Sequence, residues 1–367
     1  MKKGAALIEA PDYLSIATAL CKEISAGVYA EPDSFPSLTR IMKRFGVSRP
    51  SAVRSVAELK RQGLVASIKG SRTFVLKKNR KIGLAIPGTA DSDFFTAVMD
   101  GLVNNCQEAG MEPVVGDIFA VNHSKRDRQA ERLARHFVAL GVAGVIMQPV
   151  GFSENADHLN GLIADMLDKA HIPVVLVDYD IAPPPERSRY DVVSIDNFNA
   201  GRKMAAHLME VGARRICCLF RRLCADSVRT RFAGVETEVR RARGWCRCDT
   251  IVAEPDDVKA VASALEKFRP DAIVCSNDIA ASILAKTLKK LHVRIPGDIL
   301  LAGFDDVREA ARMKPRLTSM KQPCRELADT AFRTLMERMA NPLLQPRKIL
   351  LDTALVIRES TGGGARL

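Results

Sequence analysis

The stretch "FPSLTRIMKRFGVSRPSAVRSVAELKRQGLV", residues 35 to 65, sets arginines and lysines on an apolar pattern of helical spacing. Ser37 is a natural helix start and Gly46 a natural helix end, so we expect a first short helix between them. Ser48 then suits the N-cap of a second helix, with Pro50 in its tolerated first turn. The stretch therefore predicts two short helices joined by a glycine turn.

The second helix is expected to run to about Gln62 and to have two distinct faces. Spacings of three and four residues place side chains on the same side of a helix. The expected inward face consists of Val53, Val56, Ala57 and Leu59. The expected outward, polar face consists of Ser51, Arg54, Ser55, Glu58 and Arg61.

Regular patterns also flank this helix pair. Apolar residues recur at helical spacing between Leu14 and Ile24 and stop before Gly27, which predicts a preceding helix with a glycine cap. After the pair, "LVASIKGSRTFV" alternates around Gly70 as two short strands joined by a tight turn do. The first 76 residues thus predict three helices and a hairpin.

Positive charge is concentrated in the same part of the chain. Residues 1–81 hold 16 Lys and Arg against 6 Asp and Glu, whereas the whole chain holds 55 and 43 and has a net charge of +12. The remaining 286 residues are therefore close to neutral. A basic segment beside a neutral body is typical of a polyanion-binding module, with a merely solubilising surface as the alternative.

Length and composition exclude several classes of protein. A chain of 367 residues with 47% apolar content predicts two or three compact units. The N-terminus lacks the pattern of a secretion signal, and the longest apolar run, from Phe137, is too short to cross a bilayer, so we expect a cytoplasmic protein without a membrane partner. Nine cysteines without metal-ligand spacing predict reduced thiols, and we expect no metal and no cofactor.

Two helices, a glycine turn and a basic hairpin have a physical use on duplex DNA. The second helix can enter the major groove with Arg49 and Ser51 near base edges or phosphates. Lys69, Ser71 and Arg72 of the hairpin can reach an adjacent groove, and helix N-termini add amide donors to phosphate oxygens. A helical domain whose basic face is only solvated is the alternative.

Residues 14 to 76 resemble the winged helix-turn-helix of GntR-type transcription factors, through the run P-S, G-V-S-R, a helix ending in G-L-V and a wing G-x-x-T-F-V. The resemblance implies DNA contact by Arg49 and by the wing glycine, Gly70. Thr39 stands where the family often has a contacting arginine, with Arg40 beside it. Val53 takes the place of the recognition-helix arginine, and we expect its neighbour Arg54 to make that contact. The full set of expected DNA-binding residues is Ser37, Thr39, Arg40, Ser48, Arg49, Ser51, Arg54, Lys69, Gly70, Ser71 and Arg72.

Beyond the linker "KKNRK" the pattern changes to apolar strands alternating with amphipathic helices. Strands such as "IGLAIPG", "AGVIMQP" and "IPVVLVDYD" recur with helices between them, and the pattern restarts at "VVSIDNF". This repetition predicts an α/β fold of two lobes, each a parallel sheet with helices on both faces.

Polar residues follow several of these strands. In parallel sheets ligands bind outside the carboxyl ends of the strands. Carboxylates and amides with a nearby arginine and aromatic rings suit a polyhydroxylated ligand, because each hydroxyl both donates and accepts. Taken one at a time, such residues are more often helix caps or turn residues, and it is their repetition at strand ends in both lobes that favours a ligand site. The strand ends hold Ser92, Asp93, Gln148, Asp178, Asn277, Asp278, Asp305 and Asp306.

Residues 81 to 360 resemble the effector domain of LacI/GalR regulators, which is itself similar to periplasmic sugar-binding proteins. The matching stretches include "VSIDNFNAGRKMAAHLMEVGARRI" and "VCSNDIAASILAKTLKKLHVRIPGDILLAGFDD". The family's first cleft loop commonly reads N-P-F-F, and this chain has Ser92 and Asp93 there, which changes the polar contact. The resemblance and the strand ends together imply a cleft lined by Ser92, Asp93, Phe94, Gln148, Asp178, Tyr179, Arg231, Asn277 and Asp305.

The two resemblances imply a domain organisation. The expected units are the DNA-binding domain 1–76, the linker 77–81, the ligand-binding domain 82–360 and a flexible tail 361–367. Within the ligand-binding domain, lobe 1 is expected at about 82–193 and 322–348, and lobe 2 at about 195–319 and 351–360. The resemblance implies a side-by-side homodimer. No hinge helix of the LacI/GalR type is visible, so we expect the basic linker to reorient the heads.

These expectations describe a repressor that binds an inverted-repeat operator on double-stranded DNA and responds to a sugar or sugar derivative. Activation and corepression remain open, as does a cytoplasmic sugar-binding receptor. An enzyme is the other class, but the chain lacks G-x-S-x-G and P-loop motifs, so we expect none. A second group of arginines lies at 214, 215, 221, 222, 229, 231, 240, 241, 243 and 247. These arginines could bind an anionic ligand such as a sugar phosphate, or they could form a solvated face.

Overall fold

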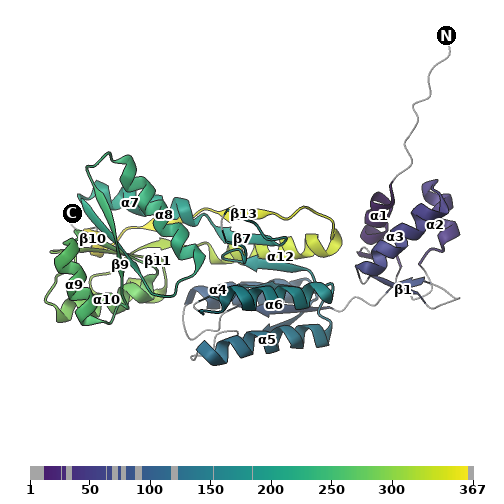
Figure 1. Ribbon diagram of the computed structural model, residues 1–367, viewed down its shortest axis with the longest axis horizontal. Coiled ribbons are helices and arrows are strands. Elements are labelled where there is room, and N and C mark those ends of the chain that lie inside the picture. The colour runs from purple at the N-terminus through teal and green to yellow at the C-terminus, as the bar shows by residue number, and fades with distance from the viewer. Residues whose placement is uncertain are drawn as a thin grey trace, which may run out of the picture.

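The computed structural model comprises a small N-terminal head and a two-lobed α/β body (Figure 1). The head lies beside one end of lobe 1, and lobe 2 lies at the other end (Figure 1). The structure describes residues 12–25, 27–29, 35–62, 64–67, 73–75, 80–86, 93–116, 123–151, 153–183 and 185–362. No helix in these residues is long and apolar enough to cross a membrane.

The head has three helices and a hairpin packed around one apolar core. Its elements are α1 (Tyr13–Ser25), α2 (Leu38–Phe45), α3 (Arg49–Arg61), β1 (Val65–Ser67) and β2 (Thr73–Val75). The Ser37 hydroxyl accepts the amide of Arg40 and caps α2, and Gly46 ends it at φ +64°, a conformation that glycine adopts without strain. The strands β1 and β2 are antiparallel, with Val65 opposite Val75. The expected winged helix-turn-helix is therefore present.

The expected faces of α3 are wrong in part. The buried side of the helix consists of Ala52, Ser55, Val56 and Leu59, whereas Val53 and Ala57 are exposed. Positions 52, 55, 56 and 59 also follow helical spacing, so the apolar pattern fits two rotations of the helix about its axis. Burial of Ser55 is satisfied locally because its hydroxyl donates to the Ala52 carbonyl at 2.8 Å.

Lobe 1 is built on a six-stranded parallel sheet with the order β13-β7-β6-β5-β3-β4. Its strands are β3 (Lys81–Ala85), β4 (Glu112–Gly116), β5 (Gly144–Met147), β6 (Val174–Val177), β7 (Asp191–Ile195) and β13 (Lys348–Leu351). Its helices are α4 (Asp93–Glu108), α5 (His123–Leu140), α6 (Ala156–Lys169) and α12 (Cys324–Ala340).

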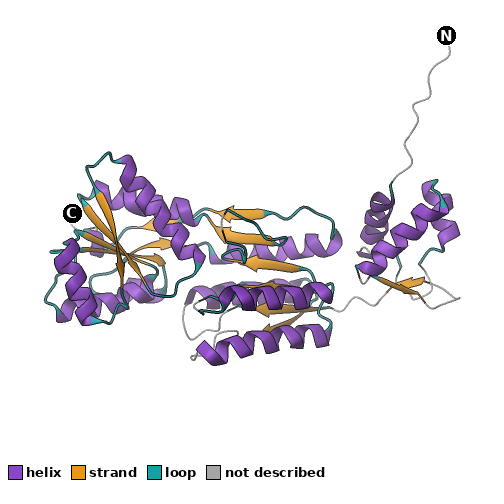
Figure 2. Cartoon of the chain, in the orientation of Figure 1, coloured by secondary structure: helices purple, strands orange, loops and turns teal. Residues whose placement is uncertain are grey.

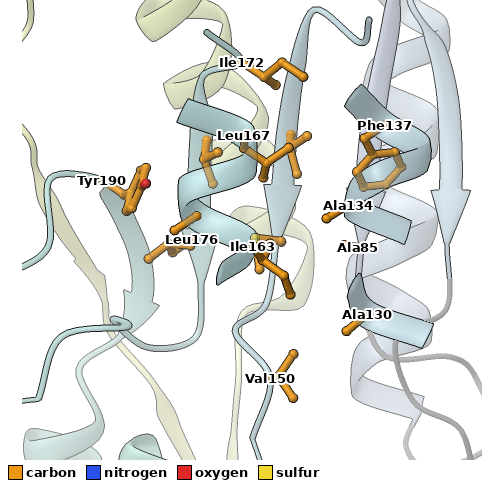
Figure 3. Packing of buried hydrophobic residues seen from close by; sticks show 14 of the residues in the cluster. Ala85, Ala130, Ala134, Phe137, Val150, Ile163, Leu167, Ile172, Leu176 and Tyr190 are labelled. Atoms are coloured by element: carbon orange, nitrogen blue, oxygen red, sulfur yellow. The ribbon is translucent and has the colours of Figure 1, made fainter. Parts of the chain in front are cut away.

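Both faces of this sheet are covered by helices (Figure 2). On one face α4 and α12 pack on the strands, and on the other face α5 and α6 do. Figure 3 shows the second face, where Phe137 of α5 and Ile163 and Leu167 of α6 lie with Ala85 and Leu176 of the strands. Burial on both faces explains why the strand sequences are continuous apolar runs.

Lobe 2 repeats this plan with the strand order β14-β12-β11-β10-β8-β9. Its strands are β8 (Arg215–Phe220), β9 (Arg247–Val252), β10 (Ala272–Cys275), β11 (Leu300–Asp305), β12 (Thr318–Lys321) and β14 (Ala354–Val356). Its helices are α7 (Asn197–Glu210), α8 (Asp226–Arg241), α9 (Val258–Phe268), α10 (Asp278–Lys290) and α11 (Arg308–Arg312), with a 3-10 turn η1 (Glu359–Thr361). The edge strand β14 pairs antiparallel to β12, so this sheet is mixed rather than wholly parallel as expected.

The chain passes between the lobes three times. It leaves lobe 1 between β7 and α7, returns between β12 and α12, and leaves again between β13 and β14. These passages lie near Asp196, Gln322 and Asp352. Three closely spaced connections are the usual basis of hinge motion between two rigid lobes.

The helices α7 and α8 approach each other very closely. A Cβ added at Gly201 of α7 would lie 1.8 Å from the Arg231 carbonyl oxygen, and one at Gly234 of α8 would lie 2.0 Å from the Phe198 carbonyl oxygen. Only glycine permits this separation of the two backbones. The pair therefore fixes the position of α8 and of the side chains that it carries.

Candidate DNA-binding surface and interlobe ligand site

The exposed side of the head carries the polar residues expected to contact DNA. Arg40 of α2 and Arg49 and Arg54 of α3 are all exposed, and the described residues offer none of them an ion-pair partner. Their charges therefore face solvent and can meet phosphates. Ser37 and Thr39 are exposed at the start of α2.

The N-terminal turn of α3 begins at Ser48. Ser48 takes the N-cap position without a side-chain bond to the helix backbone, and its hydroxyl lies 3.2 Å from that of Ser51. The backbone amides of the first turn are consequently not capped by Ser48. An uncapped N-terminus is a ready site for a phosphate oxygen.

Val53 is a surface residue that the sequence interpretation placed in the core. It is 44% exposed and lies in the same part of α3 as Arg49 and Arg54. An exposed apolar side chain on a helix that enters the major groove can contact a thymine methyl group. Its occupation of the position where the resembled family has an arginine was the available clue.

The hairpin is described only in its two strands. The Ser67 and Thr73 hydroxyls lie 2.7 Å apart and join the strands where the connecting turn begins. The four expected hairpin contacts, Lys69, Gly70, Ser71 and Arg72, lie outside the described residues, and so does Ser92 of the body.

In the body, side chains from both lobes meet at the carboxyl ends of the strands. Gln148 follows β5, Asp178 follows β6 and Asp305 ends β11. Gln148 Nε2 donates to Asp178 Oδ2 at 2.9 Å, and the Ser227 hydroxyl of lobe 2 donates to the same oxygen at 3.3 Å. The Oε1 of Gln148 is buried and has no hydrogen-bond partner among the described residues. A ligand donor would satisfy this oxygen.

Arg231 supplies the positive charge of this site. Its side chain lies on α8, is 4% exposed and is held over the Phe304 ring at 5.0 Å. Its Nε donates to Asn197 Oδ1 at 2.7 Å, and its Nη1 donates to the Ser276 carbonyl at 2.9 Å and lies 3.8 Å from Asp305 Oδ1. The guanidinium is thus fixed in one orientation before any ligand arrives.

Burial raises the pKa of both aspartates in this site. Loss of solvent is the main cause for Asp178 and for Asp305, the Arg231 charge opposes it, and the nearby Asp305 carboxylate raises the pKa of Asp178 further. Both backbones are also in the left-handed region, at φ +80° for Asp178 and +101° for Asp305. Costly charge burial and costly backbone conformations at the same residues are typical of functional sites.

The remaining expected site residues differ in their surroundings. Asn277 caps α10 by accepting the Ala280 amide at 2.9 Å. The Tyr179 hydroxyl donates to the Pro149 carbonyl at 2.8 Å. Asp93 is exposed at the start of α4 and accepts the Arg308 amide of lobe 2 at 3.2 Å, which bridges the lobes. Phe94 is buried in the core of lobe 1.

Three polar residues of the site were missed by the sequence interpretation. Asn197 holds Arg231, Ser227 bonds Asp178, and Gln322, which is 4% exposed, donates to Asp305 Oδ1 at 2.5 Å. Asn197 and Gln322 occupy two of the three passages between the lobes. Gln322 directly follows β12 and Asn197 lies two residues after β7, but no local pattern distinguishes them from ordinary cap or turn residues.

The second group of arginines is largely neutralised by ion pairs. Arg231 belongs to the site above, and the other pairs are Arg215 with Asp271, Arg221 with Glu254, Arg222 with Glu154, Arg229 with Asp226, Arg240 with Glu236, Arg241 with Glu238 and Arg247 with Asp249. This pattern favours a solvated face over an anion-binding site.

The described residues contain no group of three or more His, Cys, Asp or Glu arranged to hold a metal ion. The nine cysteines, all of them described, form no disulfide with one another.

Comparison with known proteins gives matches to both parts of the chain. Residues 12–75 match the family described as "Bacterial regulatory proteins, gntR family". Residues 205–361 match the "Periplasmic binding protein-like domain". The HTH-type transcriptional repressor PurR of Yersinia pestis is 28% identical over 344 residues, which cover 88% of this chain and 96% of that repressor.

Solved structures share the fold. The complex of transcriptional regulator CelR with cellobiose superposes with a TM-score of 0.65 at 20% identity and covers 92% of this chain and 99% of CelR. A periplasmic binding protein/LacI transcriptional regulator from Alkaliphilus metalliredigens QYMF, complexed with D-xylulofuranose, gives a TM-score of 0.61 at 22% identity. The superposition covers 77% of this chain and 98% of that regulator.

Proposed function

We propose that this chain, which joins a GntR-type helix-turn-helix domain to a periplasmic-binding-protein-like domain, is a transcriptional repressor whose operator affinity is set by a small ligand between its lobes. The head binds duplex DNA and the body binds the ligand. The observation that carries the proposal is the presence, in one chain, of an exposed basic helix and of a buried Arg231 held beside Asp305, across the lobes from Asp178.

The DNA contacts follow from the surface of the head. Arg49 and Ser51 in the first turn of α3 approach base edges or phosphates, and Arg54 and Arg40 approach the backbone. Val53 is assigned an apolar base contact. The hairpin residues Lys69, Gly70, Ser71 and Arg72 are assigned to an adjacent groove from the sequence pattern.

The ligand is assigned as a neutral, polyhydroxylated molecule such as a sugar. Two carboxylates and one guanidinium leave the site with no excess of positive charge, so the site disfavours the binding of a phosphate group. Fixed donors and acceptors from both lobes suit hydroxyl groups, and a ligand hydroxyl can donate to Gln148 Oε1, which has no partner in the described part of the chain. The two solved structures with the same fold are complexes with sugars, cellobiose in one and D-xylulofuranose in the other.

The proposal assigns the chain no catalytic step and places it on DNA in the cytoplasm. A homodimer would place two heads on an inverted repeat, because a two-fold axis in the protein matches one in the operator. A ligand that contacts both lobes closes them around it and changes the relative position of the two heads. The coupling free energy between ligand binding and operator binding is about 1 to 3 kcal/mol.

The test uses the full chain and a labelled duplex from its own upstream region. Fluorescence anisotropy at fixed salt gives the Kd with and without cellobiose or D-xylulose, and a scrambled duplex of the same length is the control. We expect specific binding and a change of about 5- to 150-fold in Kd with one of the sugars.

Thermal unfolding with the same sugars, and with their phosphates, provides the second readout, because a ligand that binds the native state raises the melting temperature. Stabilisation by a sugar without specific DNA binding would make the chain a sugar receptor. Preference for a phosphate would refute the assigned ligand class, and equal affinity for both duplexes would refute the repressor.

A further inference from the structure

The head touches the body at the end of one helix. The Cys21 thiol of α1 donates to the Ala340 carbonyl at 3.2 Å, and Ala340 is the last residue of α12. In Figure 1 this end of α12 lies on the side of lobe 1 that faces the head. The last carbonyls of a helix have no partner within the helix, so one of them is satisfied here by the other domain.

The opposite end of α12 begins at the ligand site. Gln322 stands two residues before the helix and donates to Asp305 Oδ1 at 2.5 Å. The 17 residues of α12 span about 25 Å. Leu327, Ala331 and Leu335 are fully buried against the sheet and α4. A packed helix of this kind moves as a rigid body, so displacement at one end reaches the other.

A second connection runs parallel to the first along β7. At the head-facing end, Arg338 of α12 pairs with Asp191 of β7 at 2.9 Å, and Asp191 is completely buried. At the other end of β7 the Ser194 hydroxyl donates to the Asp178 carbonyl. The last turn of α12 is therefore tied to both aspartates of the site, through the helix itself and through β7.

The contact between head and body is small and loosely filled. A cavity of about 720 Å³ separates Arg61, Gln62 and Leu64 of the head from Tyr190, Met339 and Pro342 of lobe 1. The Oε1 of Gln62 is buried there without a hydrogen-bond partner among the described residues. Incomplete packing of this kind permits a second arrangement of the two domains at a small difference in free energy.

We propose that α12 is the element that transmits the state of the ligand site to the DNA-binding head, by docking α1 on its C-terminal turn. The inference rests on the proposed function and specifies its regulation. Ligand contact with Asp305 changes the position of Gln322 and of α12, and the docked head changes its orientation with them. The linker then serves as a tether.

The docking itself is tested without any ligand. In the full chain, Ala340→Cys places a thiol beside the native Cys21. Oxidation with diamide, proteolysis without reductant and mass spectrometry then measure the disulfide between Cys21 and the introduced thiol. We expect at least ten times more of this disulfide than of one between Cys21 and a cysteine introduced at the exposed Ala311 of lobe 2. Equal yields in the two variants would overturn the docking.

The transmission is tested by crowding the contact. Ala340→Arg adds a long side chain at the docking point, and Ala311→Arg makes the same change on lobe 2 as the matched control. The measured quantity is the ratio of operator Kd with and without cellobiose or D-xylulose, whichever raises the melting temperature of the unmodified chain. We expect this ratio to approach 1 in Ala340→Arg, with the affinity for the sugar within threefold of the unmodified chain.

An unchanged ratio in Ala340→Arg would refute transmission through this contact. Failure of the proposed function has a different signature, because the unmodified chain would then show no specific DNA binding or no response to either sugar. The disulfide measurement decides the docking in that case as well.

Discussion

Two carboxylates and one guanidinium lie in the interlobe site, so its acidic groups outnumber its basic group. Asp178 and Asp305 are held in water-poor surroundings with backbones in the left-handed region. Arg231 offsets part of the cost. Sites arranged for binding commonly sacrifice stability in this way.

The first prediction concerns Asp178→Asn. The folded-state pKa of Asp178 is raised, so its protonated form is favoured by folding. The protonated carboxyl therefore contributes its whole stabilisation at pH values below its pKa in the unfolded chain, about 3.9. This contribution is lost as the pH rises through its pKa in the folded protein. Asparagine avoids this loss, tolerates positive φ, and leaves Arg231 beside Asp305. We expect the variant to be more stable by about 1 kcal/mol at pH 7.5 and to lose ligand binding.

Urea denaturation between pH 4.5 and 7.5 measures this effect, and the difference from the unmodified chain should grow with pH. Asp165→Asn is the control, because Asp165 is exposed and 3.7 Å from Arg189, and should change stability by less than about 0.5 kcal/mol. If Asp178→Asn is less stable than the unmodified chain at pH 7.5, the prediction is wrong, because the Asp178 carboxylate would then stabilise the folded protein.

The second prediction concerns Arg49→Ala. Arg49 is exposed and makes no ion pair with the described residues, so its loss should leave the melting temperature unchanged. Operator binding should weaken by roughly 1 to 3 kcal/mol, and a phosphate contact would also reduce the salt slope by about 1. Anisotropy titrations at several salt concentrations measure both. Lys60→Ala, in the last turn of α3, should have a much smaller effect, and equal losses in both variants would count against a specific role for Arg49.

At the scale of elements, the α7–α8 pair holds Arg231 in place through two glycines. The third prediction is that Gly201→Ala forces these helices apart, because the new Cβ would lie 1.8 Å from the Arg231 carbonyl oxygen. We expect a loss of about 1 to 3 kcal/mol in stability and at least a tenfold loss of ligand affinity.

Gly161→Ala in α6 is the matched control, since no atom of the described residues outside its own helix backbone and chain neighbours lies within 4 Å of its Cβ position. It should stabilise the protein by about 0.5 to 1 kcal/mol through helix propensity. Calorimetric titration and thermal unfolding of both variants supply the data. Retained ligand affinity in Gly201→Ala would show that α8 does not need this close contact to position Arg231.

Most helices and strands were predictable because their residues carry local information. Gly46 and Ser37 bound α2 by backbone conformation and by a side-chain cap. The rotation of α3 was not predictable, because Val53 and Ala52 fit helical patterns equally well and only tertiary packing selects Ala52 and Ser55 for the core. The antiparallel direction of β14 was not predictable either, because it depends on how the third passage between the lobes brings the chain to the edge of the sheet.

At the scale of the whole molecule, the two-lobed body and the basic head follow from the repeating strand pattern and from the uneven charge. The residues that complete the site could not be read in the same way. Asn197 and Gln322 reach Arg231 and Asp305 because two passages between the lobes bring them there. Their roles depend on contacts between segments distant in sequence, which no local pattern encodes.

The central claim is that one chain couples a ligand site between its lobes to a DNA-binding head. Coupling between two binding sites is reciprocal, so the factor by which the ligand changes operator affinity must equal the factor by which operator changes ligand affinity. The fourth prediction follows from this equality. Calorimetric titration of the full chain with the stabilising sugar, alone and with saturating operator duplex, measures it directly. We expect the two sugar affinities to differ by about 5- to 150-fold and by the same factor as the operator affinities, whereas identical sugar affinities in the two titrations would contradict the claim.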